Sequence, residues 1–291
     1  MAAPKLQTTT FVSHEPGSIE QTGLTLSFIA DLALKALYFN SMMTAQTLAD
    51  LLCLPYFNVL DRALAQLKRD EMVEVGGTQG FGDMAYQYQV TPKGSVRAQE
   101  LIDRNSYVGP APVTFEMYHD MLHSQSIQTT RVTPANVRQA MADLVIDDRV
   151  IDAIGQAVNT GGSLFLFGNP GNGKTVLAER ITHLLGGNVL IPHAVLVDGQ
   201  IIKVFDLQNH QPALHPGNRP EHDRRWVVCR RPAVVVGGEL TLSSLDLVYD
   251  PTTKIYEAPL QLIASNGMFL IDDFGRQQVR PSELLNRWIV P

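Results

Sequence analysis

The chain has 291 residues, 45% of them hydrophobic, which predicts a globular protein of two domains with a buried core. Its net charge of −6 at pH 7 argues against a protein whose main task is to coat nucleic acid. Cys53 and Cys229 form no CxxC pair, which argues against a disulfide framework or a zinc site. The sequence contains no run of about 18 apolar residues, so it predicts no membrane span. We therefore expect a cytoplasmic protein.

The N-terminal third shows a series of short helical patterns. Residues 1–22 are polar and contain proline and glycine, so we expect a loose arm. Apolar residues at helical spacing then predict a helix over residues 24–39. Thr44 is a suitable N-cap for a second, shorter helix over residues 45–52.

A third helix and a hairpin follow. The helix is predicted to begin at Pro55, and its apolar residues form a stripe along one face: Val59, Leu60, Leu64 and Leu67. A glycine-rich bend and an alternating pattern over residues 85–90 predict two paired strands, and a last helix should run from Pro92 to about Arg104. Three helices followed by a hairpin form the layout of a winged helix-turn-helix. Residues 23–105 accordingly resemble the winged-helix domains of transcription regulators.

The charges of this region bear on what it binds. Residues 20–105 hold seven Lys or Arg against ten Asp or Glu, a net charge of 7 − 10 = −3. Neutralisation of DNA phosphates would be weak, and the charges of the third helix cancel. We therefore favour a protein partner for this domain, with DNA binding and a purely structural role as alternatives.

Residues 106–114 contain two prolines and a glycine, which predicts a linker. Residues 115–291 are expected to form the second domain. Helices are predicted from residue 115 to about 122, after the N-cap Thr133, and over residues 148–158.

A glycine-rich loop follows an apolar run in the second domain. Residues 163–167 predict a buried strand of a parallel sheet. The loop then fits the pattern G-x-x-x-x-G-K-[ST], in the strand–loop–helix order of a P-loop, with Gly168, Asn169, Pro170, Gly171, Asn172, Gly173, Lys174 and Thr175. Glycines let successive N–H groups point at phosphate oxygens. The helix that follows the loop, with Lys174, Thr175 and Val176 at its start, adds its positive N-terminal end. We predict that residues 168–176 bind ATP, with Lys174 on the β- and γ-phosphates and the Thr175 hydroxyl on Mg²⁺.

A second motif supplies acidic groups. Residues 268–271 are apolar and predict a buried strand, which Asp272 and Asp273 close. Two adjacent carboxylates at the end of an apolar strand are costly unless they face a cation or water. We assign Asp272 to the Mg²⁺ shell and expect Asp273 to orient or activate the attacking water. A pair of solvated acids that cap a turn is the alternative.

These two motifs make residues 115–291 resemble the AAA+ ATPases, and more narrowly the bacterial AAA+ proteins described as ATPases with chaperone activity. The resemblance implies a three-layer α/β P-loop core with a parallel sheet, ATP and Mg²⁺ as cofactors, a homo-oligomeric ring in the full-length protein, and a protein client that is remodelled. An ATP-controlled DNA-binding regulator or loader, and a nucleotide-binding interaction module without turnover, are the alternative functions.

Two departures from this family qualify the expectation. Most members have Asp-Glu where this chain has Asp272 and Asp273, which changes the reach of the second carboxylate. The family also continues beyond the acidic strand with a sensor residue, an arginine finger and a helical lid. The resemblance therefore implies a C-terminally truncated chain that binds ATP but hydrolyses it poorly, since the arginine finger commonly contributes factors of about 10³ or more.

The region between the two motifs predicts mostly structural features. A hairpin is expected around Asp198 and Gly199, and Trp226 is expected to anchor the core. The histidines fit no metal-binding spacing and are interpreted as surface residues: His210, His215 and His222. Four arginines favour a solvated face over contacts with DNA, a neighbouring subunit's nucleotide or acids of the same chain: Arg224, Arg225, Arg230 and Arg231.

Overall fold

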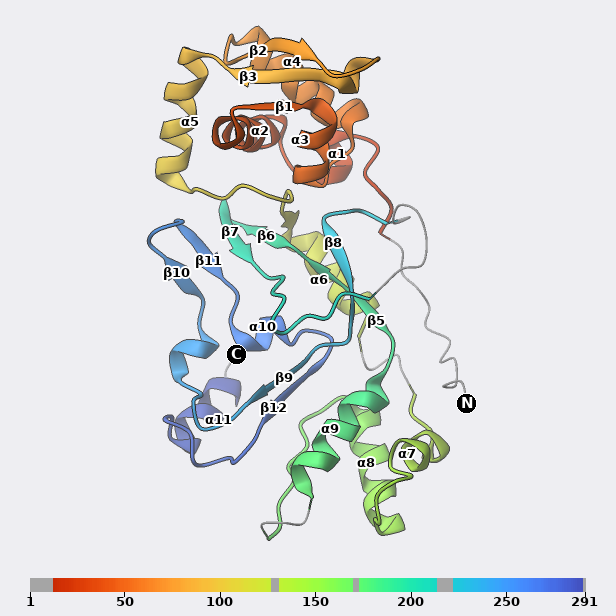
Figure 1. The fold of residues 1–291 in the computed structure, drawn as a ribbon. Coiled ribbons are helices and arrows are strands. Elements are labelled where there is room, and N and C mark those ends of the chain that lie inside the picture. Colours follow the sequence, from red (N-terminus) through yellow and green to blue (C-terminus); the bar gives the residue numbers. More distant parts are fainter. Residues whose placement is uncertain (1–12, 127–130, 170–172, 214–221, 290–291) are drawn as a thin grey trace.

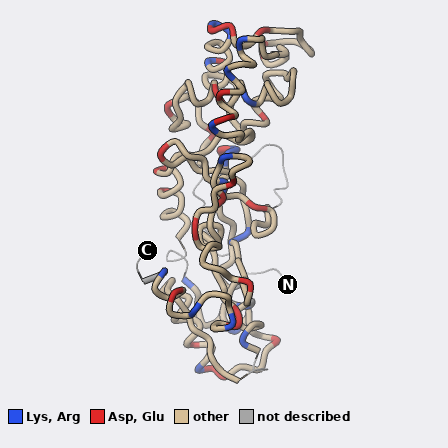
Figure 2. The backbone as a smooth tube through the Cα atoms, turned by 90° about the vertical axis from the view of Figure 1, so that its left-hand side faces the viewer, with Lys and Arg blue, Asp and Glu red and all other residues tan. Residues whose placement is uncertain are grey.

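The computed structural model describes residues 13–126, 131–169, 173–213 and 222–289. The protein is a mixed α/β protein with four small sheets among these residues. Its N-terminal unit, residues 13–105, lies at one end of an elongated molecule, a five-stranded sheet lies in the middle, and α7, α8 and α9 lie at the other end (Figure 1). Acidic and basic residues are interspersed along this length in the view of Figure 2.

The N-terminal unit combines helices with a three-stranded antiparallel sheet of order β1-β3-β2. Its helices are α1 (Ile19–Thr22), α2 (Leu26–Asn40), α3 (Ala45–Leu52), α4 (Asp61–Arg69) and α5 (Pro92–Arg104). Its strands are β1 (Met42–Thr44), β2 (Val73–Thr78) and β3 (Tyr86–Val90), and its irregular turns are η1 (Tyr56–Leu60) and η2 (Asp83–Ala85).

Most helix boundaries of this unit follow the local sequence signals. The Thr44 hydroxyl accepts a hydrogen bond from the Thr47 N–H, which confirms Thr44 as the N-cap of α3. Pro92 is confirmed at the start of α5, where the Thr91 hydroxyl caps the helix. The predicted start of the third helix, Pro55, was wrong. Helix α4 begins at Asp61, because Asn58 has a left-handed φ of 63° that interrupts the expected helix.

The core of the unit forms where the predicted apolar stripe, which extends over η1 and α4, packs with α2 and α3. All four residues of the predicted stripe are buried: Val59, Leu60, Leu64 and Leu67. Full burial of one such side chain stabilises the fold by roughly 1.5–3 kcal/mol. The prediction of a loose arm over residues 1–22 is wrong for the last of these residues. Helix α1 is capped at its start by Ser18, and it buries Ile19 and Thr22 against this core.

Residues 106–114 are part of the fold rather than a free linker. Ser106 donates two hydrogen bonds, from its N–H and its hydroxyl, to the carbonyl of Thr253. Residues 113 and 114 form β4 (Val113–Thr114), which pairs in parallel with β6, and both Ala111 and Val113 are fully buried. The prolines in this stretch prevent helix formation, but they permit an extended chain that packs against the rest of the protein.

The remainder of the chain holds three further sheets. The five-stranded sheet has the order β10-β11-β7-β6-β4, with β6 (Ala194–Val197), β7 (Gln200–Lys203), β10 (Val248–Asp250) and β11 (Ile255–Glu257). The two-stranded sheets pair β5 (Asn188–Pro192) with β8 (Trp226–Arg230) and β9 (Ala233–Val236) with β12 (Met268–Ile271). The helices are α6 (Phe115–Ser124), α7 (Pro134–Ala140), α8 (Asp148–Thr160), α9 (Lys174–Leu185), α10 (Leu260–Ile263) and α11 (Pro281–Ile289), with a short turn η4 (Leu242–Leu245).

The expected continuous parallel sheet is not found in the described residues, because several of their strands run antiparallel. The predicted hairpin at Asp198 and Gly199 is confirmed: both have positive φ, and they join β6 to β7 in antiparallel pairing. The pair β5–β8 is also antiparallel, whereas β9–β12, β4–β6 and β7–β11 are parallel. The sheets of this region are therefore small and of mixed direction.

A buried ion pair fastens the N-terminal unit to the rest of the chain. The Arg225 guanidinium is 0% exposed and contacts both carboxylate oxygens of Asp223, at 2.7 to 3.1 Å. It also donates to the carbonyls of Thr22, at 2.8 Å, and Pro112, at 3.4 Å. Arg224 beside it pairs with Asp50 on α3 at 2.7 Å. The expected solvated face is therefore wrong for Arg224 and Arg225, which bind acids and carbonyls of the same chain.

We expect Arg225→Ala to lower the free energy of unfolding by about 3–5 kcal/mol, because it leaves the Asp223 carboxylate buried without its cation. Urea unfolding followed by circular dichroism measures this loss. Arg62→Ala is the matched control, since Arg62 is an exposed arginine on α4 and should change stability by less than about 0.5 kcal/mol. Equal effects of the two substitutions would contradict the role assigned to Arg225.

Candidate functional site

The apolar run that precedes the glycine-rich loop does not form a strand. Residues 163–169 have no regular secondary structure, and Leu164, Phe165 and Phe167 are 43%, 65% and 86% exposed. The prediction of a buried strand over residues 163–167 was therefore wrong. The segment nevertheless lies near β12, since the Phe165 ring centroid is 5.8 Å from that of Phe274 and Leu166 packs in the same apolar cluster as Met268.

Helix α9 begins directly after the loop, as predicted. Gly173 is its N-cap and has φ of 70°, a left-handed conformation that is open to glycine at little cost. The first N–H groups of a helix have no partner within the helix, and they carry its positive end. Pro170, Gly171 and Asn172, which we expect to complete the phosphate-binding loop, lie outside the described residues. Val176, in the first turn, is 40% exposed.

The Lys174 side chain bends back over the loop. Its Nζ donates to the carbonyl of Gly168 at 3.0 Å and to that of Asn169 at 2.9 Å. In the described part of the chain Lys174 forms no ion pair with a carboxylate. An ammonium group bound by carbonyls has, among the described residues, no counterion of its own beside the start of α9, which makes this loop attractive to an anion.

Two residues far apart in the sequence meet at the start of α9. The Thr175 hydroxyl donates to Asp272 Oδ2 at 3.1 Å, across 97 positions of the chain. Asp272 follows β12, and its N–H donates to the Val236 carbonyl of β9 at 2.8 Å, so the parallel pairing of these strands fixes its place. The structure therefore brings together the hydroxyl and the carboxylate that the two sequence motifs predict as Mg²⁺ ligands.

The turn after Asp272 determines where the second acid points. Asp273 has a left-handed φ of 51°, and its N–H donates to Asp272 Oδ1 at 2.9 Å. The Gln277 amide donates to the carbonyls of Asp272 and Asp273, at 2.8 and 3.1 Å. Asp273 Oδ2 lies 3.5 Å from Arg276 Nη1 in an exposed pair. Sequence reasoning missed Gln277, because a glutamine four or five residues after an acid is not a recognisable signal.

The chemistry of this donor set fits Mg²⁺. Thr175 Oγ1 and Asp272 Oδ2 are hard oxygen donors that already lie next to each other. Mg²⁺ binds through one or two such protein groups together with substrate phosphates and several waters. No cluster of three or more His, Cys, Asp or Glu side chains that could hold a metal occurs among the described residues. Among the described residues, these side chains therefore do not form a zinc-type site in which the protein supplies all the ligands.

One of the three histidines of the middle region contradicts the interpretation as surface residues. His210 was interpreted as a surface residue, but its side chain is 0% exposed. Its Nδ1 accepts from the Asp206 N–H at 3.0 Å, and its Nε2 lies 2.9 Å from the Ile263 carbonyl. His222 Nε2 lies 3.1 Å from the Trp226 carbonyl, and His215 lies outside the described residues. Trp226 is confirmed as a core residue.

Comparison with models of known protein families and with curated proteins finds no match to this chain. In the part of the chain that the structure describes, no helix has the length and apolar character needed to cross a membrane. The candidate site is therefore interpreted from its own residues and from the resemblance noted above.

A buried histidine, His210, and a half-buried histidine, His193, make stability depend on pH. Burial lowers the pKa of His193 and of His210 below the ordinary value of about 6.5. Because the unfolded chain takes up the protons first, we expect full stability above pH 6.5 and a loss as the pH falls through the folded pKa values. Urea unfolding at a series of pH values between 7.5 and 5 measures this slope.

His210→Gln should reduce this pH dependence, whereas His14→Gln, at an exposed position, should leave it unchanged. An identical slope in the wild-type chain and in His210→Gln would contradict the assignment.

Proposed function

We propose that this protein binds ATP with Mg²⁺ at residues 168–176 and Asp272, and couples nucleotide binding and hydrolysis to the remodelling of a protein partner. The observation that carries the proposal is the 3.1 Å contact between the Thr175 hydroxyl and Asp272. The two residues are 97 positions apart in the sequence, and a P-loop ATPase requires the side chains of its two motifs to meet. The resemblance to AAA+ ATPases supports the finer assignment of a three-layer P-loop core.

Each polar group of the site would have one task. The N–H groups at the start of α9 and the ammonium of Lys174 would bind the phosphates, which replace the carbonyls of Gly168 and Asn169 as partners of Lys174. Thr175 and Asp272 would hold Mg²⁺, Asp272 either directly or through water. When bound, Mg²⁺ neutralises charge that develops on the phosphate oxygens.

Asp273 is the candidate group for orienting water. Its carboxylate is exposed, and the side-chain contact that it makes among the described residues is the 3.5 Å pair with Arg276, so it can accept a proton or a hydrogen bond from water. In the AAA+ proteins that this chain resembles, an arginine from a neighbouring subunit completes the site. We therefore propose that turnover requires a homo-oligomeric ring, and that an isolated chain binds ATP with little hydrolysis.

The N-terminal unit supports a protein partner better than DNA. Its helices and its three-stranded antiparallel sheet are consistent with a winged helix. In the first turn of α4, the end with which a recognition helix reads bases, Asp61 offsets the charge of Arg62, and the other basic residues of α4, Lys68 and Arg69, lie in its last turn. Salt-sensitive binding of duplex DNA would instead favour an ATP-controlled DNA-binding regulator.

We expect Lys174→Ala to weaken ATP binding by roughly ten- to a hundredfold, since the loop loses its cation and a charge-assisted contact to phosphate contributes about 1.5–3 kcal/mol. Asp272→Asn should retain Mg²⁺-free binding and lose most of the gain in affinity on adding Mg²⁺. Fluorescence titration with a labelled ATP, with and without Mg²⁺, measures both. Lys68→Ala, an exposed lysine on α4, is the control and should bind as the wild type does.

Unchanged ATP affinity in Lys174→Ala would contradict the proposed site. If Mg²⁺ still raised the ATP affinity of Asp272→Asn by the full amount, the assignment of Asp272 to the metal would be contradicted, but the ATP site would not. ATP binding without turnover at any protein concentration would favour an interaction module over an ATPase.

A further inference from the structure

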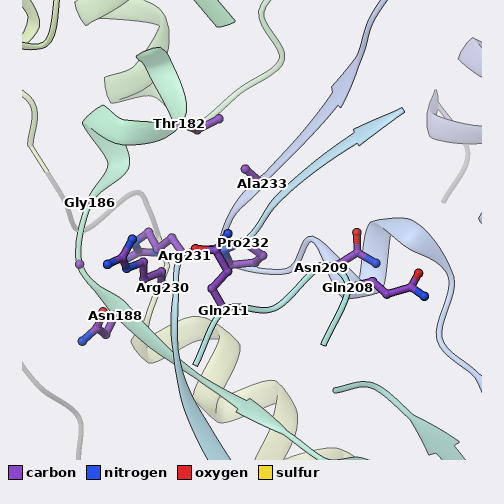
Figure 3. Close-up of a pocket in the computed structure, with 11 residues that line it drawn as sticks. Thr182, Gly186, Asn188, Gln208, Asn209, Gln211, Arg230, Arg231, Pro232 and Ala233 are labelled. Carbon is purple, nitrogen blue, oxygen red and sulfur yellow. The ribbon is translucent and has the colours of Figure 1, made fainter. Parts of the chain in front are cut away.

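A polar cavity lies at the C-terminal end of α9, where the chain turns into β5. Its volume is about 370 Å³, and its lining comes from α9, β5, β8 and the residues before β9 (Figure 3). The side chains that matter are Arg230, Arg231, Asn188 and Gln211. None of the described residues that line it is acidic.

Arg231 lies in the wall of this cavity without a carboxylate. Its Nη1 donates to the carbonyls of Gln125, at 3.1 Å, and Asn266, at 2.6 Å. Its Nε is buried and has no hydrogen-bond partner among the described residues. Burial lowers the pKa of the Arg231 guanidinium below its ordinary value, and no acid among the described residues offsets that effect. A buried donor of a charged group that lacks a partner destabilises the protein.

Arg230 adds a second charge at the end of β8. Its side chain is exposed and forms no ion pair with any described residue, and its strand partner across the β5–β8 pair is Asn188. Its N–H donates to the Gln211 carbonyl at 2.9 Å, which holds Gln211 against the same strand. Figure 3 shows both guanidinium groups on the side of the cavity where Gly186 and Asn188 lie.

The cavity therefore concentrates positive charge in a chain whose net charge is −6. Two other internal arginines, in contrast, have carboxylate partners: Arg225 pairs with Asp223, and Arg224 pairs with Asp50. Two neighbouring guanidinium groups without a counterion attract an anion, and their planar N–H forks match the oxygens of a phosphate group. A volume of about 370 Å³ lies within the range of small-molecule sites.

We propose that this cavity binds a small phosphorylated molecule, with Arg230 and Arg231 on the phosphate and the amides of Asn188 and Gln211 on polar groups of the remainder. The site is separate from the candidate ATP site. The two lie at opposite ends of α9, whose 12 residues span about 18 Å. The proposal is therefore independent of the proposed ATP binding, and α9 connects the two sites.

Calorimetric titration at constant ionic strength tests the proposal, with inorganic phosphate and a sugar phosphate as probes. All chains carry Lys174→Ala, so that the loop before α9 does not contribute. We expect binding in this background, and at least a tenfold weakening on adding Arg230→Gln, since one charge-assisted contact is lost. Arg230 is exposed, so the variant should fold, and thermal unfolding checks this. Arg62→Gln, at an exposed arginine on α4, is the matched control and should not change binding.

Arg231→Lys keeps the charge but removes the planar fork, so it should also weaken binding of both probes. Absence of phosphate binding in the Lys174→Ala background would overturn the proposal, as would equal affinity with and without Arg230→Gln. Neither result bears on ATP binding by the wild-type chain, so a failure here is distinguishable from a failure of the proposed function. Weakening of the sugar phosphate alone would contradict the assignment of the arginines to the phosphate.

Discussion

The hydrogen bond between Thr175 and Asp272 is the constraint on which the candidate site depends. It joins the start of α9 to the end of β12, and it forms only if the strands β9 and β12 are in their observed register. The N–H of Asp272 bonds to β9, so a shift by one residue would turn its carboxylate to the other face of the sheet. The geometry of two short parallel strands therefore decides whether the loop can hold a metal.

Helix α9 has different chemistry at its two ends. At its start, Gly173 and Lys174 present N–H groups and an ammonium group that is bound, among the described residues, by two carbonyls. At its end, Arg230 and Arg231 line a cavity that holds no acidic side chain among the described residues. Both ends thus offer unpaired positive charge in an acidic protein, and a rigid helix of 12 residues lies between them. A ligand at one end that tilts this helix would alter the other end.

The sequence predicted those features that local interactions determine. Thr44, Thr133 and Pro92 mark helix starts because a capping side chain bonds within three residues, and Asp198 with Gly199 forms a turn because few other pairs accept positive φ. The two halves of the candidate site were also identified from their motifs. Their contact was a prediction that rests on the resemblance to P-loop ATPases, and the structure places Thr175 next to Asp272.

The failures at residues 163–167, Arg225 and His210 concern partners that are distant in the chain. Residues 163–167 have the composition of a buried strand, but a strand exists only when a neighbour offers its hydrogen bonds, and in the described residues β12 pairs with β9 alone. Arg225 is buried because Asp223, Thr22 and Pro112 surround it, and no local pattern reveals the last two. His210 is buried for the same reason, through its contact with Ile263.

A crystal structure with Mg²⁺ and a non-hydrolysable ATP analogue tests the central claim most directly. We expect the triphosphate against the start of α9 and a metal about 2.0–2.1 Å from Thr175 Oγ1, with Asp272 bound to it directly or through one water. A nucleotide bound elsewhere on the chain, or a metal shell that contains neither the hydroxyl of residue 175 nor the carboxylate of residue 272, would contradict the account.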